Sequence, residues 1–298
     1  MTLYQKIVVR TVKKKMGRAF KVGTAPEISS DGINEYRDIK YTNRIGKELL
    51  MDIFEPKTDE KNKEFPVIIN IHGGGLISGN KKNSVGFCRL LAKRGFIVFS
   101  LEYRLVPMVQ VYEQFDDVCA GMDTVGKKLI DFNVDLMHIY LTAESAGAYL
   151  ALYVAAMTKS KQLQEAIGYE PTKIKFKAMS LISGMFYTKR KDALGRFMSP
   201  MFYGKDEKSK KIEEFTNPEN LEIISNIPPV YLVTSKADML ERYTLDFAAV
   251  LNKNNIQHKL RHMGDDPKLL HAYPVIRPDY AESEIVVEEI IKWFNEHK

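Results

Sequence analysis

The chain has 298 residues, of which 45% are hydrophobic and 28% are charged, which is the composition of an ordinary globular protein. No apolar run approaches the roughly 20 residues needed to cross a bilayer, which argues against a membrane-spanning protein. The first residues lack the apolar core of a secretory signal, and Cys88 and Cys119 do not have the spacing of zinc ligands. We therefore predict a cytoplasmic protein with two buried thiols and no bound metal.

The formal net charge of +6 is concentrated at one end of the chain. Residues 1–21 contain seven lysines and arginines and no acidic residue, so the remainder of the chain is close to neutral. A nucleic-acid-binding surface would need basic residues spread over the fold and interleaved with aromatic ones. The sequence has no such pattern, and we expect no nucleic-acid partner.

Short β-branched runs alternate with longer helical patterns along the chain, which predicts an α/β fold. Two of these runs, 66–71 and 96–103, are continuously apolar, as expected for strands buried on both faces of a mostly parallel sheet. The predicted strands are 36–42, 47–54, 66–71, 96–103, 137–142, 177–183, 229–234 and 258–263. The predicted helices are 84–94, 114–130, 146–158, 241–254 and 281–296.

Two segments fall outside this alternation. Residues 1–30 precede the first predicted strand, and apolar side chains recur in them four residues apart, as in an amphipathic helix with a basic face. Such a helix could lie on an anionic membrane or pack on the body of the protein as a lid, and we favour the lid. The second segment, about 185–225, is rich in Met, Phe and Tyr and then becomes strongly charged. We interpret it as an insertion that covers the site within a single domain of residues 1–298.

Ser145 lies between a predicted strand and the apolar helical run that follows it. A nucleophilic serine at such a sharp turn needs small residues two positions before and after it, and here these are Ala143 and Gly147. The pattern is A-x-S-x-G, and a strict G-x-S-x-G does not occur in the chain. The alternative is a serine that only caps the N-terminus of an ordinary helix. The context favours Ser145 as a nucleophile.

The sequence His72-Gly73-Gly74-Gly75 directly follows the predicted strand 66–71. Consecutive glycines let a loop turn sharply and point backbone N–H groups into a cavity. The alternatives are a flexible loop or a phosphate-binding turn, but no lysine has the spacing of a P-loop. H-G-G-G is the form that lipases and esterases use for an oxyanion hole. We interpret 72–75 as an oxyanion loop.

Three motifs match one known family in order and spacing. They are HGGG at 72–75, YRLVP at 103–107 and AESAG at 143–147, and with them the chain resembles the hormone-sensitive-lipase family of α/β-hydrolases. The resemblance covers about residue 35 to the end, and departs from the family pattern at Ala143 and Met108. It implies an eight-stranded, mostly parallel sheet flanked by helices, with a cap formed by the N-terminal segment and the insertion after the sixth strand. It also implies that the N–H groups of Gly73, Gly74 and Ala146 bind the oxyanion.

The family order of serine, acid and base points to the two remaining catalytic positions. Asp238 follows the strand 229–234, although an aspartate before a helix is also a common N-cap. His271 lies in the loop after the last strand, on the expected side of the sheet. Asp265 and Asp266 are competing acids, but they are too close in sequence to His271 for this topology.

The predicted reaction is hydrolysis of a small-molecule ester by a serine carboxylesterase, through an acyl-enzyme on Ser145 and with no metal or organic cofactor. We expect short acyl chains, because bulky residues of the predicted cap would shorten the pocket. The alternatives are a membrane-associated lipase that docks through residues 1–21, a peptidase or amidase, and a non-catalytic binding protein with the hydrolase fold. Peptidases of this fold often carry a large extra domain, for which this chain has no room.

Overall fold

The computed structural model describes residues 10–11, 26–44, 47–210 and 215–298. Its centre is one eight-stranded sheet in the order β1-β2-β4-β3-β5-β6-β7-β8. The strands are β1 (Ile33–Arg44), β2 (Lys47–Pro56), β3 (Phe65–Ile71), β4 (Ile97–Leu101), β5 (Val134–Glu144), β6 (Met179–Ile182), β7 (Val230–Ser235) and β8 (His258–Met263). β2 runs antiparallel to both of its neighbours, and the strands from β4 to β8 are parallel. The predicted fold class is confirmed, with every predicted strand present and only the ends shifted.

The helices are α2 (Val85–Lys93), α3 (Val111–Lys128), α4 (Ala146–Met157), α5 (Lys161–Ile167), α6 (Ala193–Tyr203), α8 (Leu221–Ile224), α9 (Glu241–Lys253), α10 (Tyr273–Ile276) and α11 (Ala281–Asn295). Short 3₁₀ turns lie at η1 (Lys81–Ser84), η2 (Leu129–Asp131) and η3 (Gly204–Lys208). The five predicted helices correspond to α2, α3, α4, α9 and α11. The sequence analysis did not predict α5, α6, α8 and α10.

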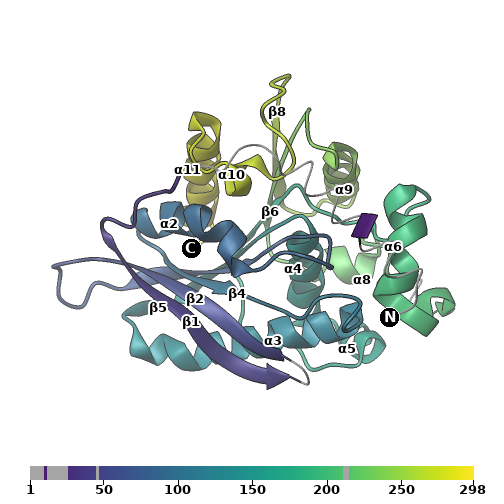
Figure 1. Ribbon diagram of the computed structural model, residues 1–298, viewed down its shortest axis with the longest axis horizontal. Coiled ribbons are helices and arrows are strands. Elements are labelled where there is room, and N and C mark those ends of the chain that lie inside the picture. Colours follow the sequence, from purple (N-terminus) through teal and green to yellow (C-terminus); the bar gives the residue numbers. More distant parts are fainter. Residues whose placement is uncertain (1–9, 12–25, 45–46, 211–214) are drawn as a thin grey trace.

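Helices cover both faces of the sheet, and alternate side chains of β3 pack into a different hydrophobic cluster on each face. Val67, Ile69 and Ile71 pack into the hydrophobic cluster that also contains the buried residues of α3 and α4. Ile68 lies between them in sequence and packs into a second cluster with α2 and α11, because successive side chains of a strand point to opposite faces. Figure 1 shows α2 and α11 together on one side of the sheet and α3 on the other.

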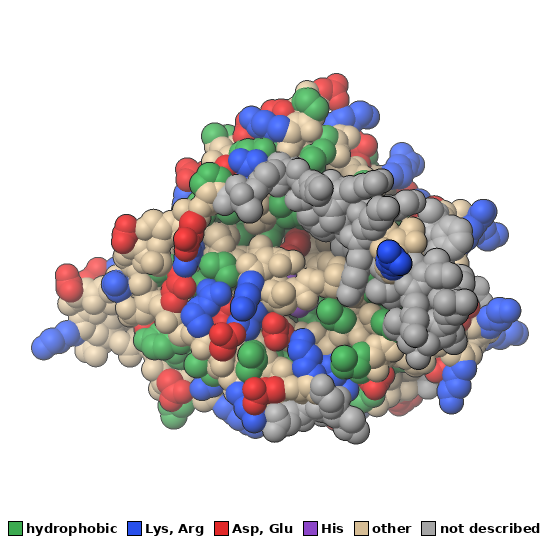
Figure 2. All heavy atoms as spheres, in the orientation of Figure 1, with side chains coloured by type: hydrophobic (Ala, Val, Ile, Leu, Met, Phe, Trp, Pro, Cys, Tyr) green, Lys and Arg blue, Asp and Glu red, His purple; other side chains and the backbone are tan. Residues whose placement is uncertain are grey.

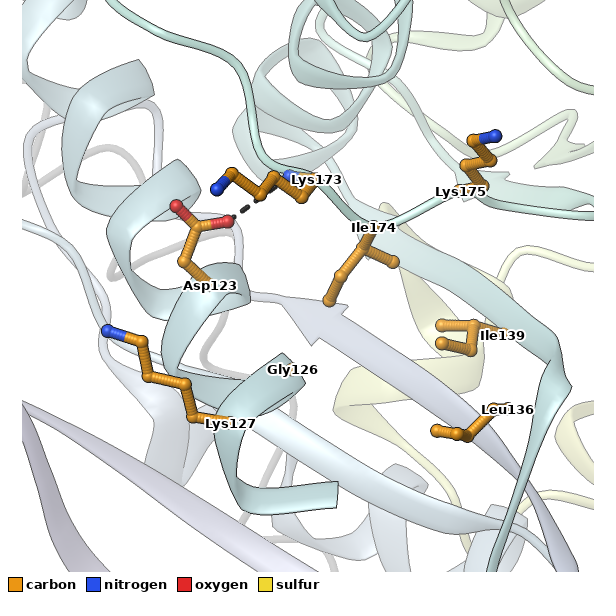
Figure 3. Close-up of a pocket in the computed structure, with 8 residues that line it drawn as sticks. All are labelled: Asp123, Gly126, Lys127, Leu136, Ile139, Lys173, Ile174 and Lys175. Carbon is orange, nitrogen blue, oxygen red and sulfur yellow. Dashed lines mark hydrogen bonds between the residues drawn. The ribbon is translucent and has the colours of Figure 1, made fainter. Parts of the chain in front are cut away.

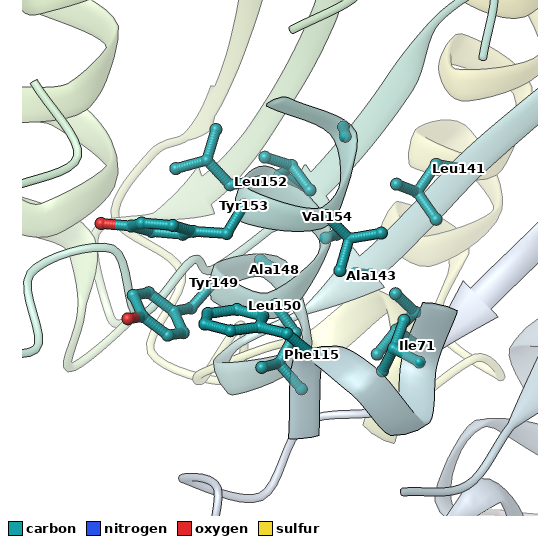
Figure 4. Packing of buried hydrophobic residues seen from close by; sticks show 14 of the residues in the cluster. Ile71, Phe115, Leu141, Ala143, Ala148, Tyr149, Leu150, Leu152, Tyr153 and Val154 are labelled. Atoms are coloured by element: carbon teal, nitrogen blue, oxygen red, sulfur yellow. The ribbon is translucent and has the colours of Figure 1, made fainter. Parts of the chain in front are cut away.

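Helix α4 begins directly after Ser145 and is buried in the core. Every residue from Ala146 to Met157 is buried, which accounts for an almost entirely apolar sequence. Figure 4 shows α4 packed against Ile71, Leu141 and Ala143 of the strands and against Phe115 of α3. Such a helix has little freedom to move, and it fixes the residue immediately before it.

The insertion 185–225 contains α6, η3 and α8 and packs on the body of the protein. Phe186 stacks on Phe247 of α9 with the ring centroids 4.3 Å apart, and the Tyr203 hydroxyl lies 2.7 Å from that of Tyr149 in α4. The described apolar side chains that were predicted to wall off the pocket are buried; they are Met185, Phe186, Tyr187, Met198, Met201, Phe202 and Tyr203. The predicted helix in residues 1–30 falls mostly outside the described residues, and the role of both segments as a cap stays a prediction.

Candidate active site

The candidate residues gather at the carboxyl ends of the parallel strands. The glycine loop follows β3, Ser145 follows β5, Asp238 follows β7 and His271 follows β8. Ligands of open α/β sheets bind at this edge, because the loops that leave neighbouring strands meet there. The topology alone therefore brings together residues up to 199 positions apart in sequence.

Ser145 is a strained residue at the strand-to-helix turn. Its backbone has φ 54° and ψ −118°, a region that costs a residue with a side chain about 1–3 kcal/mol. The structure retains it because the Ser145 N–H donates to the carbonyl of Ile182 at 2.9 Å and α4 begins at the next residue. The serine hydroxyl makes no capping bond to α4, so the capping role considered above does not apply.

The two small residues around Ser145 are required to different degrees. A Cβ at Gly147 would lie 2.2 Å from the carbonyl oxygen of Ile71 and 2.6 Å from that of His72, so only glycine fits. Ala143 pairs with Ile71 in the ladder between β5 and β3, and its methyl group is buried in the core. The departure from the family pattern at 143 is therefore accommodated by packing, whereas the glycine at 147 is a steric necessity.

Ser145, His271 and Asp238 form a continuous chain of hydrogen bonds. His271 Nε2 lies 2.8 Å from Ser145 Oγ, and His271 Nδ1 lies 2.6 Å from Asp238 Oδ1. The three residues are 6%, 7% and 5% exposed, respectively, so water screens these contacts little. The structure thus brings together the three residues that were predicted as nucleophile, base and acid.

Asp238 is held as a carboxylate. Burial acts to raise its pKa, but the charge of His271 and hydrogen bonds from His271, Ser183 and the Leu240 N–H outweigh it, and the pKa is lowered. The Leu240 N–H donates to Oδ1 at 2.8 Å, and the Thr234 hydroxyl donates to Oδ2 at 3.0 Å. A carboxylate with this many donors is fixed in place and can orient the imidazole.

The two competing acids lie elsewhere. Asp265 is exposed, and the Asp266 carboxylate lies 3.3 Å from the ammonium group of Lys268. Asp238 occupies the Nδ1 side of His271, which is where the acid of a triad belongs. The geometry therefore favours Asp238.

Ser183, at the end of β6, links the acid and the base. Its hydroxyl oxygen accepts the Ala272 N–H at 2.9 Å, and the hydroxyl is one of the groups that lower the pKa of Asp238. The residue is buried and has φ 52°, in the left-handed region. Sequence reasoning missed Ser183, because a serine that ends a strand carries no recognisable pattern.

The glycine loop lies directly against the nucleophile. A Cβ at Gly73 would be 2.9 Å from both the carbonyl oxygen of Glu144 and the Cβ of Ser145. Gly74 has φ 120°, and a Cβ there would lie 1.9 Å from the carbonyl oxygen of Ser78. The loop can approach Ser145 this closely only because it has no side chains.

The structure differs from the prediction on one of the three oxyanion donors. The Gly73 N–H donates to Glu144 Oε1 at 2.7 Å and is therefore not directed at a substrate. The N–H of Gly74 donates to no residue in the described ranges, and that of Ala146 opens α4, where it has no acceptor within the helix. Gly74 and Ala146 remain candidate donors, and Gly73 is instead a point of attachment.

The YRLVP segment at 103–107 packs against the start of the glycine loop. The Tyr103 ring stacks on His72 at 4.3 Å, and its hydroxyl donates to the His72 carbonyl at 2.8 Å. Burial lowers the pKa of His72 to about 4, so this histidine is neutral near pH 7 and its Nδ1–H donates to the Gly73 carbonyl at 2.7 Å. The neighbouring Arg104 pairs with Asp117 at 2.8 Å. Tyr103 therefore holds the start of the glycine loop in place. His72, whose Nδ1 is bonded to the Gly73 carbonyl, is excluded as the base that activates Ser145.

The described residues contain neither a metal-binding cluster nor a membrane-spanning helix. No group of three or more His, Cys, Asp or Glu side chains in the described ranges is arranged to hold a metal ion. Among the described helices, none is long and apolar enough to cross a membrane. On the face shown in Figure 2, acidic and basic side chains are interspersed over the coloured surface.

A separate pocket of about 570 Å³ lies at the other end of β5. Figure 3 shows it between α3, the start of β5 and residues 173–175; its lining residues are Asp123, Gly126, Lys127, Leu136, Ile139, Lys173, Ile174 and Lys175. Ser145 follows the carboxyl end of β5, whereas Leu136 and Ile139 lie near the amino end. This pocket is not part of the site around Ser145.

Comparisons with known proteins agree with this description. A sequence profile of the BD-FAE family matches residues 51–243. The probable isoprenylcysteine alpha-carbonyl methylesterase of Oryza sativa is 30% identical over 126 residues, which are 42% of this chain and 30% of that protein. The isoprenylcysteine alpha-carbonyl methylesterase of Arabidopsis thaliana is also 30% identical over 126 residues, which are 42% of this chain and 29% of that protein. The matched region therefore spans less than a third of these curated relatives.

Solved structures share the fold over almost the whole chain. Esterase B of Lactobacillus rhamnosis, crystallised with a tributyrin phosphonate, has a TM-score of 0.88 at 21% identity and covers 98% of this chain and 96% of its own. An esterase of Pyrobaculum calidifontis has a TM-score of 0.70 at 19% identity, and the match covers 98% of this chain and 92% of the esterase.

The sheet order, the serine at the strand-to-helix turn and the hydrogen-bonded acid and base define an α/β-hydrolase, and the resemblance to the hormone-sensitive-lipase family is confirmed. The chain belongs to the BD-FAE family, whose profile covers well over half of its length.

Proposed function

We propose that this protein is a serine carboxylesterase that hydrolyses small-molecule esters with short acyl chains. The observation that carries the proposal is the buried chain from Ser145 Oγ through His271 to Asp238, with links of 2.8 Å and 2.6 Å. A hydroxyl is a weak nucleophile alone, and an adjacent oriented base is what activates it.

In the proposed reaction, His271 Nε2 takes the Ser145 proton as Oγ attacks the ester carbonyl carbon. Asp238 holds the imidazole in the required tautomer and stabilises the imidazolium that forms. The N–H groups of Gly74 and Ala146 donate to the tetrahedral oxyanion. His271 then protonates the leaving alcohol, and a water activated by the same histidine hydrolyses the acyl-enzyme and releases the acid.

The proposed substrate class rests on the apolar residues of the insertion. In an enclosed apolar pocket each buried methylene contributes about 0.8 kcal/mol until the pocket is full, after which longer chains clash. A short acyl chain is in keeping with one similar structure, that of esterase B, which was crystallised with a tributyrin phosphonate. We infer that specificity rises over two to four carbons and falls beyond about six.

Two further expectations belong to this proposal. Cys88 and Cys119 are free and buried, in support of a reducing compartment such as the cytoplasm. The alternative of a lipase that docks on a membrane through residues 1–21 concerns a segment that lies almost entirely outside the described residues. A non-catalytic binding protein is disfavoured, because no member of the hydrogen-bonded chain is missing.

The test is kcat/KM across p-nitrophenyl esters from acetate to palmitate, for the full chain and for a variant without residues 1–21. We expect a maximum between acetate and hexanoate for both proteins in detergent-free buffer. A maximum at ten carbons or longer that depends on a lipid or detergent surface and is lost in the truncated variant would favour the membrane-associated lipase.

A further inference from the structure

Glu144 is a buried acid directly before the nucleophile, and the proposed reaction does not use it. Its side chain lies at the carboxyl end of β5 and is 5% exposed. Oε1 accepts the Gly73 N–H at 2.7 Å and the more distant Ser84 hydroxyl at 3.4 Å. Oε2 is buried and has no hydrogen-bond partner among the described residues.

No described cation compensates for this carboxyl group. Within the described ranges, no Lys, Arg or His nitrogen lies within 4.0 Å of either of its oxygens. Burying an acid without a partner destabilises a fold, so a hydrophobic residue would be the expected choice at a purely structural position. The one short bond that Glu144 makes ends on the glycine loop.

That bond determines where the next peptide group points. Gly73 is in contact with Glu144 and Ser145, so the loop and the nucleophile touch at this residue. Once the Gly73 N–H is held by Glu144, the following N–H belongs to Gly74, which has no acceptor in the described part of the chain. Three successive glycines would otherwise sample many backbone conformations.

We propose that Glu144 is a positioning residue that anchors the oxyanion loop to the nucleophile turn, through Oε1 and the Gly73 N–H, and thereby directs the Gly74 N–H at the reacting carbonyl oxygen. This inference rests on the proposed esterase function. It assigns no proton transfer to Glu144.

The charge state of Glu144 matters because an oxyanion develops beside it. Burial raises the pKa of Glu144 to about 8, so the side chain is neutral near pH 7 and still accepts the Gly73 N–H through its carbonyl oxygen. The charge of Glu144 acts on two other described titratable groups, the Cys88 thiol of α2 and the Tyr103 hydroxyl after β4, and burial raises the pKa of both. Above pH 8 an ionised Glu144 would place a negative charge near the oxyanion, and kcat should decline.

The experiment compares Glu144→Gln, Glu144→Ala and the matched control Ser84→Ala by kcat and KM for p-nitrophenyl butyrate between pH 5 and 10. The amide of Glu144→Gln keeps an oxygen acceptor without a charge, so we expect wild-type kcat at pH 7 and no decline near pH 8. Glu144→Ala should lower kcat by about 10²- to 10³-fold with little change in KM, as for loss of an oxyanion donor. Ser84→Ala removes only the 3.4 Å contact and should change kcat little.

Amide exchange of Gly73, measured by NMR, separates this inference from the esterase proposal. The Gly73 N–H should be protected in the wild type and in Glu144→Gln and should exchange faster in Glu144→Ala. If the wild type hydrolyses no ester, the proposed function fails while the exchange data still test the anchor. Wild-type kcat and Gly73 protection in Glu144→Ala, or equal loss of kcat in Glu144→Gln and Glu144→Ala, would overturn the inference.

Discussion

The Ser183 hydroxyl, directly after β6, accepts the Ala272 N–H at 2.9 Å and helps to lower the pKa of Asp238, so one side chain connects the loops that carry the acid and the base. His271 is the residue next to Ala272. The distance between Asp238 and His271 therefore depends on a third loop as well as on their own.

Replacing Ser183 with Ala should lower kcat by up to about 10²-fold, because a small displacement of the His271 loop misplaces the base. The loss of a donor should also raise the pKa of Asp238, whose lowered value contributes stability that is present above its unfolded pKa and lost as the pH falls through its folded pKa. The control is Ser180→Ala in the neighbouring strand β6, which removes a buried hydroxyl that has no hydrogen-bond partner among the described residues. The comparison is kcat for p-nitrophenyl butyrate, and equal activity of both variants would contradict the role of Ser183.

Asp238→Asn should reduce kcat by about 10⁴-fold, because an amide beside Nδ1 favours the wrong histidine tautomer. Asp265→Asn and Asp266→Asn are the controls and should keep nearly wild-type kcat, since neither carboxylate is placed at Nδ1. If either control is the costly substitution, the assignment of Asp238 as the acid is wrong.

Gly147→Ala should destabilise the protein by at least about 1–3 kcal/mol, because the added methyl group meets two backbone oxygens that cannot move independently of β3. Ala143→Gly provides the contrast: it restores the family pattern and should cost no more than about 1 kcal/mol. Urea unfolding at equilibrium measures both changes. A Gly147→Ala variant as stable as the wild type would show that the nucleophile turn is less crowded than the structure indicates.

The centre of the sheet could be predicted from sequence because strands such as β3 and β4 are buried on both faces. The runs 66–71 and 96–103 read as β3 and β4 for that reason, with ends shifted by one or two residues. Helix α6 was not predicted: Leu194, Met198 and Met201 have helical spacing, but Gly195 and Pro200 lower the helical propensity of the segment. The helices α8 and α10, of four residues each, are too short for any periodicity to be visible.

Ser145, Asp238 and His271 could be predicted because each stands at a fixed place relative to a strand. The direction of the Gly73 N–H could not, since it is set by a contact with Glu144, 71 residues away. Glu144 itself carried one signal that was overlooked: a charged residue between two small ones, directly before the nucleophile. Ser183 carried none, because its importance lies in a backbone conformation and a contact across 89 residues.

The most direct test of the whole account is kcat of purified Ser145→Ala on p-nitrophenyl acetate, with circular dichroism to show that the variant is folded. Loss of the nucleophile should lower kcat by about 10⁴- to 10⁶-fold while the fold is retained, because the hydroxyl is nearly buried and makes no capping bond. A folded Ser145→Ala protein that hydrolyses the ester at the wild-type rate would contradict the account.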